Sequence, residues 1–249
     1  MWVVGFGVVA HAASPTRWHP RPTTHAWQLQ LQGAIDTSVD APVYDVDGAD
    51  VPRSTVRELH ERGRRVVCYV DVGTWEDWRD DADRFPKAAR GKPVDGWPGE
   101  YWLDVRRHDI RPILAARLKR CRDRGYDGID PENVNGYTND TGFPLTAADQ
   151  REFNRWVAAR AHGLGLAVGL KNELEQAKEL EPRFDFAVLE SCFEFDECGP
   201  ARRFVSANKA VVAVEYELPR SSFCPRAREL RFAAMLKRLA LGAWRRPCG

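Results

Sequence analysis

The sequence lacks an excess of charge of either sign. Its 249 residues include 37 Lys and Arg against 36 Asp and Glu, which gives a formal net charge of +1. The basic residues are interspersed with acidic ones, so no basic tract is present to neutralise a phosphate backbone. This pattern argues against nucleic acid as a partner.

Long apolar runs are missing beyond the first twelve residues, so we expect no membrane span. Residues 1–12 are apolar and end in a small-x-small pattern, which favours a signal peptide cleaved after Ala12, although its usual charged n-region is missing. We expect a Pro-rich spacer at 13–24 and the folded domain at 25–249. The protein is therefore expected to be secreted and extracellular, without membrane association.

Recognisable metal and cofactor motifs are also absent. The sequence has no C-x-x-C, and its six histidines are scattered without the spacing of metal ligands. No G-x-G-x-x-G follows the first expected strand, which argues against a dinucleotide. We expect neither a metal nor a cofactor.

Six cysteines form an even set, which export would allow to pair as disulfides. Cys192 and Cys198 are close enough in sequence to bridge the loop that follows an expected strand, and Cys224 and Cys248 lie near the C-terminus. Cys68 lies inside a buried strand pattern, where we expect a small apolar filler rather than half of a disulfide.

Eight apolar or β-branched runs alternate with helix-like stretches, as in a parallel α/β sheet. This number of units in about 250 residues predicts a (β/α)8 TIM barrel, with a doubly wound open sheet as the alternative. No linker or internal repeat is present, so we expect a single domain and a monomer. The expected strands are Trp27–Gly33, Val43–Asp47, Arg65–Val72, Tyr126–Glu132, Leu166–Asn172, Phe184–Glu190, Ala210–Tyr216 and Arg231–Lys237; the expected helices include Ser54–Arg62, with Ser54 as N-cap, Asp109–Arg124, and Thr146–Gly163, with Thr146 as N-cap.

The fourth and sixth expected strands end in carboxylates. Asp130 and Glu132 share one face of the fourth strand, Pro131 ends its regular pairing, and Glu190 ends the sixth strand. Strand-end acids of this kind suggest the carboxylate pair of a glycoside hydrolase. For each acid alone, capping of the following helix is an equally good explanation.

The remaining expected strand ends are polar and acidic, with aromatic side chains between the acids. Carboxylates and amides bind hydroxyl groups, and flat aromatic faces suit sugar rings, so we expect a polar and cationic substrate. Lys171 is interpreted as an ion-paired orienting residue, because neighbouring acids do not lower an amine pKa as a Schiff-base lysine requires. Trp78 and Trp97 are left open between cleft and loop core. The expected substrate-binding residues are Asp36, Tyr44, Asp45, Asp47, Tyr69, Asp71, Trp75, Glu76, Asn133, Tyr137, Lys171, Asn172, Glu215 and Tyr216.

A series of short motifs occurs in a fixed order along the chain: Trp27-Gln28-Leu29, Val43-Tyr44-Asp45-Val46-Asp47, Gly73-Thr74-Trp75-Glu76-Asp77-Trp78-Arg79, Gly128-Ile129-Asp130-Pro131-Glu132-Asn133, Gly169-Leu170-Lys171-Asn172, Glu190-Ser191-Cys192 and Val214-Glu215-Tyr216. Together they resemble glycoside hydrolase family 114, which comprises endo-α-1,4-polygalactosaminidases and spherulin-4-like proteins. The resemblance implies a (β/α)8 barrel that cleaves galactosamine-containing polysaccharide. It also implies that an acid of the strand-four motif and Glu190 form the catalytic pair.

The chain departs from that family at the strand-four motif. Members usually read Glu-Pro-Asp-Asn-x-Asp-Gly-Tyr, whereas here the motif runs from Asp130-Pro131-Glu132-Asn133 to Tyr137. We expect Glu132 as nucleophile, Glu190 as general acid/base and Asp130 as the substitute nucleophile, with retention of configuration. The alternative is a catalytically weak carbohydrate-binding protein of the cell wall or spore.

Overall fold

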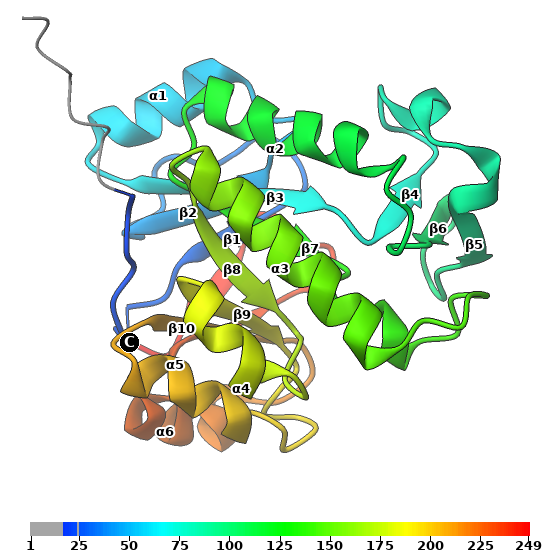
Figure 1. Cartoon of the computed structure of the whole chain (residues 1–249). Coiled ribbons are helices and arrows are strands. Elements are labelled where there is room, and N and C mark those ends of the chain that lie inside the picture. The colour runs from blue at the N-terminus through cyan, green and yellow to red at the C-terminus, as the bar shows by residue number, and fades with distance from the viewer. Residues whose placement is uncertain (1–16, 24) are drawn as a thin grey trace, which may run out of the picture.

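The computed structural model describes residues 17–23 and 25–249, so the predicted signal peptide lies outside the described residues (Figure 1). Its main sheet has nine strands in the order β1-β2-β3-β7-β8-β9-β10-β11-β12. The first eight are parallel neighbours, and only β12 runs antiparallel, against β11. Helices follow most of the parallel strands, which confirms the predicted (β/α)8 barrel in a single domain.

All eight predicted strands are present, each within or close to its predicted range. They are β1 (Gln28–Gln30), β2 (Val43–Asp47), β3 (Arg65–Asp71), β7 (Gly128–Glu132), β8 (Ala167–Lys171), β9 (Phe186–Glu190), β10 (Ala210–Glu215) and β11 (Ala233–Lys237).

The seam between β11 and β1 is closed by backbone that the sequence did not predict. The amides of Leu31 and Gln32 both donate to the Leu241 carbonyl, at 2.9 and 3.3 Å. β12 (Arg245–Pro247) then pairs with β11. Arg245 donates to the carbonyls of Ala26 and Trp27, so the C-terminal segment joins the last barrel strand to the first.

The helices are α1 (Arg53–Glu61), α2 (Arg111–Arg124), α3 (Ala147–Gly163), α4 (Ala177–Leu180), α5 (Arg202–Ser206) and α6 (Arg220–Leu230). α3 begins with the predicted N-cap: Thr146 and Asp149 form a reciprocal capping box. The predicted N-cap at Ser54 is wrong, because α1 begins directly after Pro52, which fits the preference for an extended residue at that position. No helix separates β1 from β2.

The barrel interior is filled by inward-facing apolar side chains, including Val67, Phe186 and Met235. Trp18 covers the end of the barrel at which the parallel strands begin. Its ring centroid lies 5.8 Å from that of Trp27 and 6.3 Å from that of Phe186. The Ala210 amide donates to the Pro20 carbonyl. The described part of the predicted spacer is thus packed against the barrel, and the folded region starts before residue 25.

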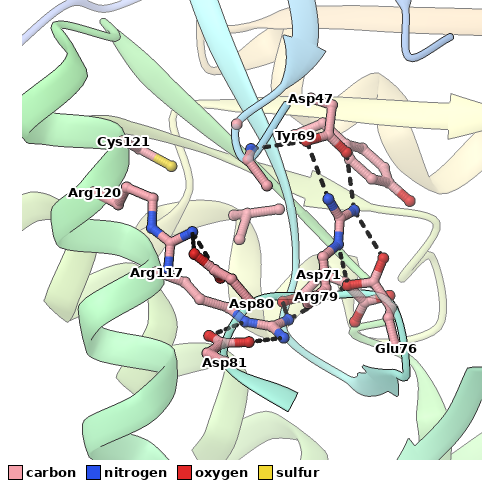
Figure 2. Close-up of a pocket in the computed structure, with 13 residues that line it drawn as sticks. Asp47, Tyr69, Asp71, Glu76, Arg79, Asp80, Asp81, Arg117, Arg120 and Cys121 are labelled. Carbon is pink, nitrogen blue, oxygen red and sulfur yellow. Dashed lines mark hydrogen bonds and ion pairs between the residues drawn. The ribbon is translucent and has the colours of Figure 1, made fainter. Parts of the chain in front are cut away.

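A small antiparallel sheet, β4 (Thr74–Glu76), β5 (Arg90–Pro93) and β6 (Glu100–Leu103), occupies the long segment after β3 and lies to one side of the barrel strands (Figure 1). Two arginines, the buried Arg117 and the partly buried Arg79, anchor it (Figure 2). Arg79 pairs with Asp47 at 2.9 Å and with Glu76 at 2.8 Å, and Arg117 of α2 pairs with Asp81 at 2.7 Å. We call residues 73–107 the insertion.

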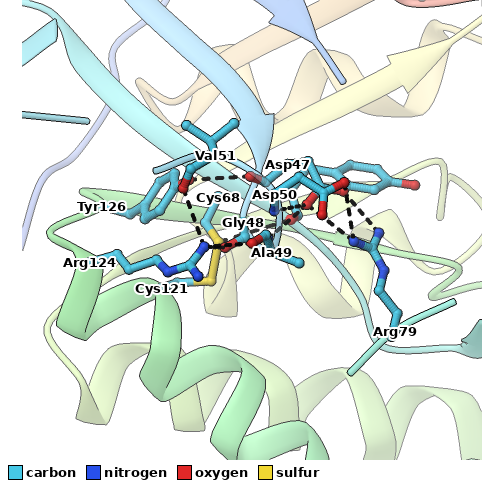
Figure 3. The surroundings of a disulfide bond; sticks show 11 residues. Asp47, Gly48, Ala49, Asp50, Val51, Cys68, Arg79, Cys121, Arg124 and Tyr126 are labelled. Atoms are coloured by element: carbon cyan, nitrogen blue, oxygen red, sulfur yellow. Dashed lines mark hydrogen bonds and ion pairs between the residues drawn. A yellow bond between two sulfur atoms is a disulfide. The ribbon is translucent and has the colours of Figure 1, made fainter. Parts of the chain in front are cut away.

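All six cysteines pair. Cys192 and Cys198 form the predicted bridge, and Cys224 pairs with Cys248. The prediction for Cys68 is wrong, because it pairs with Cys121 of α2 (Figure 3). A Cβ at Gly48 would lie 2.1 Å from the Cys68 sulfur, so the turn after β2 passes directly over this bridge and needs a glycine. Among the described residues, no helix is long and apolar enough to cross a membrane.

Candidate active site

Lys171 connects three carboxylates at the C-terminal end of the barrel. It ends β8, is 2% exposed, and its Nζ contacts Glu132 of β7 directly. The same Nζ lies 3.4 Å from Glu190 Oε2 and 3.5 Å from Asp130 Oδ2. Alternation along each strand turns these side chains inward, and the parallel register brings them together. Lys171 therefore lies among all three acids, and its orienting role stays a prediction.

The electrostatics of this group follow from burial and from the shared ammonium. Burial opposes the charge on Lys171, but Asp130, Glu132 and Glu190 outweigh it and raise the lysine pKa well above its usual value. For Glu190, burial acts to raise the pKa, but Lys171 and the Tyr216 hydroxyl outweigh it and leave the pKa below its usual range. Both groups are consequently charged near neutral pH.

Glu190 is held by partners on both neighbouring strands. The hydroxyl of Tyr216, which follows β10, donates to Glu190 Oε1. The backbone amide of Glu190 donates to Asn172 Oδ1 at 2.8 Å, and Asn172 itself adopts a left-handed conformation with φ 50°. Two predicted substrate-binding residues thus orient the predicted general acid/base.

Asp45 and Asp130 form a second buried pair beneath Lys171. Both are almost fully buried, at 2% and 0% exposure, and no described residue donates a hydrogen bond to either side-chain oxygen of Asp130. Burial is the main reason that the Asp130 pKa rises to about 6 and that the Asp45 pKa rises well above its usual value.

Glu132 is held from the other side by Asn133. The Asn133 amide N–H donates to Glu132 Oε1 at 3.2 Å, while its side chain donates to Asp71 and Glu100 at 2.7 and 2.9 Å. Glu132 therefore has one oxygen on Lys171 and the other on Asn133, which fixes its orientation.

A cleft of about 590 Å³ opens above these residues, within the range of ligand sites. Glu132, Lys171, Glu190 and Tyr216 lie on one side. The insertion contributes Trp78 and Trp97, each 53% exposed, and the β1 and β11 ends contribute apolar side chains. The residues that line it are Leu31, Gln32, Asp47, Asp50, Tyr69, Glu76, Trp78, Arg79, Val94, Trp97, Glu100, Glu132, Asn133, Lys171, Glu190, Tyr216, Leu239, Ala240 and Leu241.

Several predicted substrate-binding residues lie outside this lining. Asp45 and Asp71 are buried beneath it. Trp75 lies inside the insertion, where its indole N–H donates to Ala82 and Arg90 stacks 3.8 Å from its ring centroid. The prediction that Trp75 binds substrate is thus corrected, and Trp78 and Trp97, left open between cleft and loop core, line the cleft.

Four further predictions are corrected by hydrogen bonds made elsewhere. The Tyr44 hydroxyl donates to the carbonyls of Asp36 and Val39, outside the barrel. Asp36 accepts from Ser38 in an exposed loop. Glu215 accepts the amides of Phe193 and Glu194, and so holds the loop after β9.

Tyr137 is the fourth of these residues. Its hydroxyl donates to Glu173 at 3.2 Å and to Glu175 at 2.8 Å, which joins the loop after β7 to the loop after β8. Its contacts therefore support the shape of the rim and lie outside the cleft lining.

The sequence interpretation missed Arg79, Asp50 and Glu100. Arg79 forms ion pairs with Asp47 and Glu76, so two of the predicted rim acids are already neutralised. An arginine three residues after Glu76 was the available signal. Asp50, whose side chain is 78% exposed, and Glu100 supply cleft carboxylates that no motif announced.

The arrangement suits acid–base and nucleophilic work on a polar polymer. In residues 17–23 and 25–249, no group of three or more His, Cys, Asp or Glu side chains is placed to hold a metal. Two inward carboxylates at the C-terminal rim of a (β/α)8 barrel define a glycoside hydrolase.

Comparison with known proteins gives the family. Residues 8–249 match glycoside-hydrolase family GH114, and the chain belongs to this family. The crystal structure of Aspergillus fumigatus Ega3 in complex with galactosamine matches with a TM-score of 0.89 and 34% sequence identity, over 94% of this chain and 99% of that chain. This comparison agrees with the barrel and single domain described above.

Two further similarities are weaker. The glycoside hydrolase domain of PelA from Pseudomonas aeruginosa matches with a TM-score of 0.67 over 87% of this chain and 94% of that chain; its 16% identity supports the fold alone. An uncharacterised protein of Thermotoga maritima is 22% identical over 125 residues, which span 45% of this chain and 39% of that protein.

Proposed function

We propose that this glycoside hydrolase cleaves α-1,4-linked galactosamine polymers within the chain and with retention of configuration. The observation that carries the proposal is the single ammonium of Lys171, which contacts Glu132 and lies 3.4 Å from Glu190. The similarity to Ega3, crystallised with galactosamine, supports the substrate class.

The spacing of the two carboxylates supports retention. Because Glu132 Oε2 and Glu190 Oε2 both lie against the same Nζ, they are at most about 6 Å apart, below the ~6.5–9.5 Å typical of inverting enzymes. Glu132 attacks the anomeric carbon as the glycosidic oxygen takes a proton from Glu190. Glu190 then removes a proton from the water that hydrolyses the glycosyl ester.

The contacts of the two acids support this division of roles. Lys171 lies directly against Glu132 and holds one of its oxygens, which orients the carboxylate for attack. Glu190 lies farther from the ammonium and has its other oxygen on the Tyr216 hydroxyl, a contact that favours its ionised form, so Glu190 takes up the proton that it donates only at acidic pH. Asp130 is fully buried beneath them and remains the substitute nucleophile only if Glu132 proves dispensable.

Charge and shape of the cleft support a cationic polymer. Six carboxylates line it, against the cations of Arg79 and Lys171, which leaves an acidic surface. The half-exposed indoles of Trp78 and Trp97 offer faces for sugar rings on the insertion side. Three disulfides support a secreted, extracellular enzyme, as expected for an oxidising compartment.

The test is incubation of the protein with deacetylated galactosamine polymer, with reducing-end release and the anomer of the first product followed by NMR. We expect internal cleavage and an α-anomeric product, and binding to the polymer that weakens with salt. A β-anomer would contradict retention. Binding without any product would favour the alternative of a catalytically weak carbohydrate-binding protein.

A further inference from the structure

Four side chains from separate segments meet beside Glu132. Asp71 ends β3, Thr74 begins β4, Glu100 begins β6 and Asn133 follows β7. The Thr74 hydroxyl lies 2.6 Å from both Asp71 Oδ2 and Glu100 Oε1. The Asn133 amide nitrogen contacts the same two oxygens, at 2.7 and 2.9 Å. We call these four residues the Asn133 network.

The number of hydrogens in this network fixes its charge. A threonine hydroxyl has one hydrogen, so it donates to only one of the two carboxyls at a time. The other short contact requires a carboxyl that donates to the threonine oxygen. Asp71 and Glu100 therefore hold one proton between them. Burial, the first cause, together with the charges of Glu76 and Glu132, raises the pKa of both groups, and the charge of Glu100 raises the Asp71 pKa further, which agrees with this count.

The network contacts a residue in a backbone conformation that most L-residues rarely adopt, although asparagine does so more readily. Asn133 has φ 59°, in the left-handed region. In this conformation its N–H points to Glu132 Oε1, at 3.2 Å. Gly73 packs against its carbonyl so closely that a Cβ would lie 1.7 Å from the oxygen. The backbone on one side and the carboxyl pair on the other thus fix Asn133.

Glu100 is the member of the network that reaches the cleft. It is 8% exposed, belongs to the insertion, and follows Trp97 by three residues. The insertion is thereby connected to Asn133, directly after the strand that carries Glu132, by hydrogen bonds to Glu100 at 2.9 Å and to Thr74 at 3.3 Å. If Asp71 and Glu100 held no proton between them, two adjacent buried carboxylates would repel one another.

We propose that Glu100 is a positioning residue that sets the Glu132 carboxylate by holding Asn133 through a one-proton pair with Asp71. This inference rests on the proposed role of Glu132. Loss of Glu100 removes one of the two carboxyl acceptors of the Asn133 side chain and so loosens the contact of its N–H with Glu132 Oε1, while Asp71 still accepts from Asn133 and Lys171 still holds Oε2. The effect falls on turnover more than on substrate binding, because the displaced atom is a reacting one.

The experiment compares Glu100→Ala, Glu100→Gln and Asp81→Asn with the wild type. Glutamine imitates the protonated carboxyl, since it can donate to Thr74 and accept from Asn133. Asp81→Asn disturbs the Arg117 anchor of the insertion without touching Asn133, so it controls for simple loosening. We expect Glu100→Ala to lower kcat by about 100-fold with KM little changed, as a displacement of about 1 Å does. Glu100→Gln and Asp81→Asn should retain turnover within a few-fold.

A crystal structure of Glu100→Ala gives a readout that does not depend on activity. Asn133 should leave the left-handed region and lose its contact with Glu132. An unchanged Asn133 in that crystal, an unchanged kcat, or an equal loss in Glu100→Gln would overturn the proposal. If the wild type hydrolyses no aminosugar polymer, the proposed function fails, and the crystal comparison still decides whether Glu100 positions Glu132.

Discussion

Lys171 Nζ lies 3.4 Å from Glu190 Oε2 while it contacts Glu132 directly. One cation therefore serves both members of the proposed catalytic pair. Burial acts to raise the Glu190 pKa, but this cation and the Tyr216 hydroxyl outweigh it, so Glu190 reaches the protonated state that its role needs only at acidic pH. This relationship leads to the first two expectations.

Replacement of either acid by its amide should abolish turnover and spare binding. Glu132→Gln removes the attacking oxygen and Glu190→Gln removes the proton donor, so each should lower kcat by several orders of magnitude. The affinity for an oligosaccharide, measured by calorimetry, should change little. Glu61→Gln, on the exposed face of α1, is the matched control. Near-normal turnover in Glu132→Gln with loss in Asp130→Asn would move the nucleophile to Asp130.

Tyr216→Phe should shift the pH dependence of turnover. The Tyr216 hydroxyl and Lys171 both lower the Glu190 pKa against the effect of burial. Glu190 thus loses the proton needed for the first step as pH rises through its lowered pKa. The wild type should therefore be most active under acidic conditions. Removal of the hydroxyl raises the Glu190 pKa, so the basic limb of the kcat profile should move to higher pH. A basic limb at the same pH in both proteins would contradict this role.

Arg79→Met should destabilise the fold, because it leaves Asp47 and Glu76 buried without their cation. Breaking a buried pair from one side costs about 3–5 kcal/mol. We expect this loss in the free energy of unfolding measured with urea. Arg57→Met, whose ion pair on α1 is exposed, should give no measurable loss. Similar urea midpoints of unfolding for the two variants would show that the stability of the insertion does not depend on Arg79.

Glu173→Gln should change how stability depends on pH. Burial is the main reason that the Glu173 pKa rises to about 7 from the ordinary value of 4.5, despite hydrogen bonds from Gln176 and Tyr137. A raised carboxyl pKa contributes stability below the unfolded pKa, and this stability is lost as pH rises towards 7. Relative to wild type, the variant should therefore gain up to about 3 kcal/mol between pH 4.5 and 8. Parallel curves of melting temperature against pH would refute the assignment.

Removal of the Cys68–Cys121 disulfide should lower stability alone, whereas removal of the Cys192–Cys198 disulfide should lower both stability and turnover. Cys68 and Cys121 close a segment of 53 residues, and Cys192 and Cys198 close one of 6. Loop entropy predicts losses of about 4 and about 2 kcal/mol for the respective double serine variants. Only Cys192→Ser/Cys198→Ser should also lower kcat, because its loop follows Glu190 directly. Equal kcat in both variants would exclude a role for that bridge in holding the site.

Much of the barrel could be predicted because strand patterns are local. Apolar runs of the right length gave eight strands, and the residues that end them gave Glu132, Lys171 and Glu190. The same alternation carried a signal that was not used: Tyr44 cannot face inward with Asp45, nor Glu215 with Tyr216. Both were misassigned to the cleft although they lie on the opposite face of their strands.

The sequence by itself determined which residues form strands and which acids stand at their ends, since both depend on neighbouring residues and on a period of two. Only the tertiary structure decided which of those acids face a substrate. Arg79 neutralises Asp47 from 32 residues away, and Asp130 joins Asp45 beneath the site. Glu100 reaches Asn133 across 33 residues. Such pairings depend on the path of the insertion and on the register of the barrel strands. Both bring distant segments together, and no local sequence pattern encodes them.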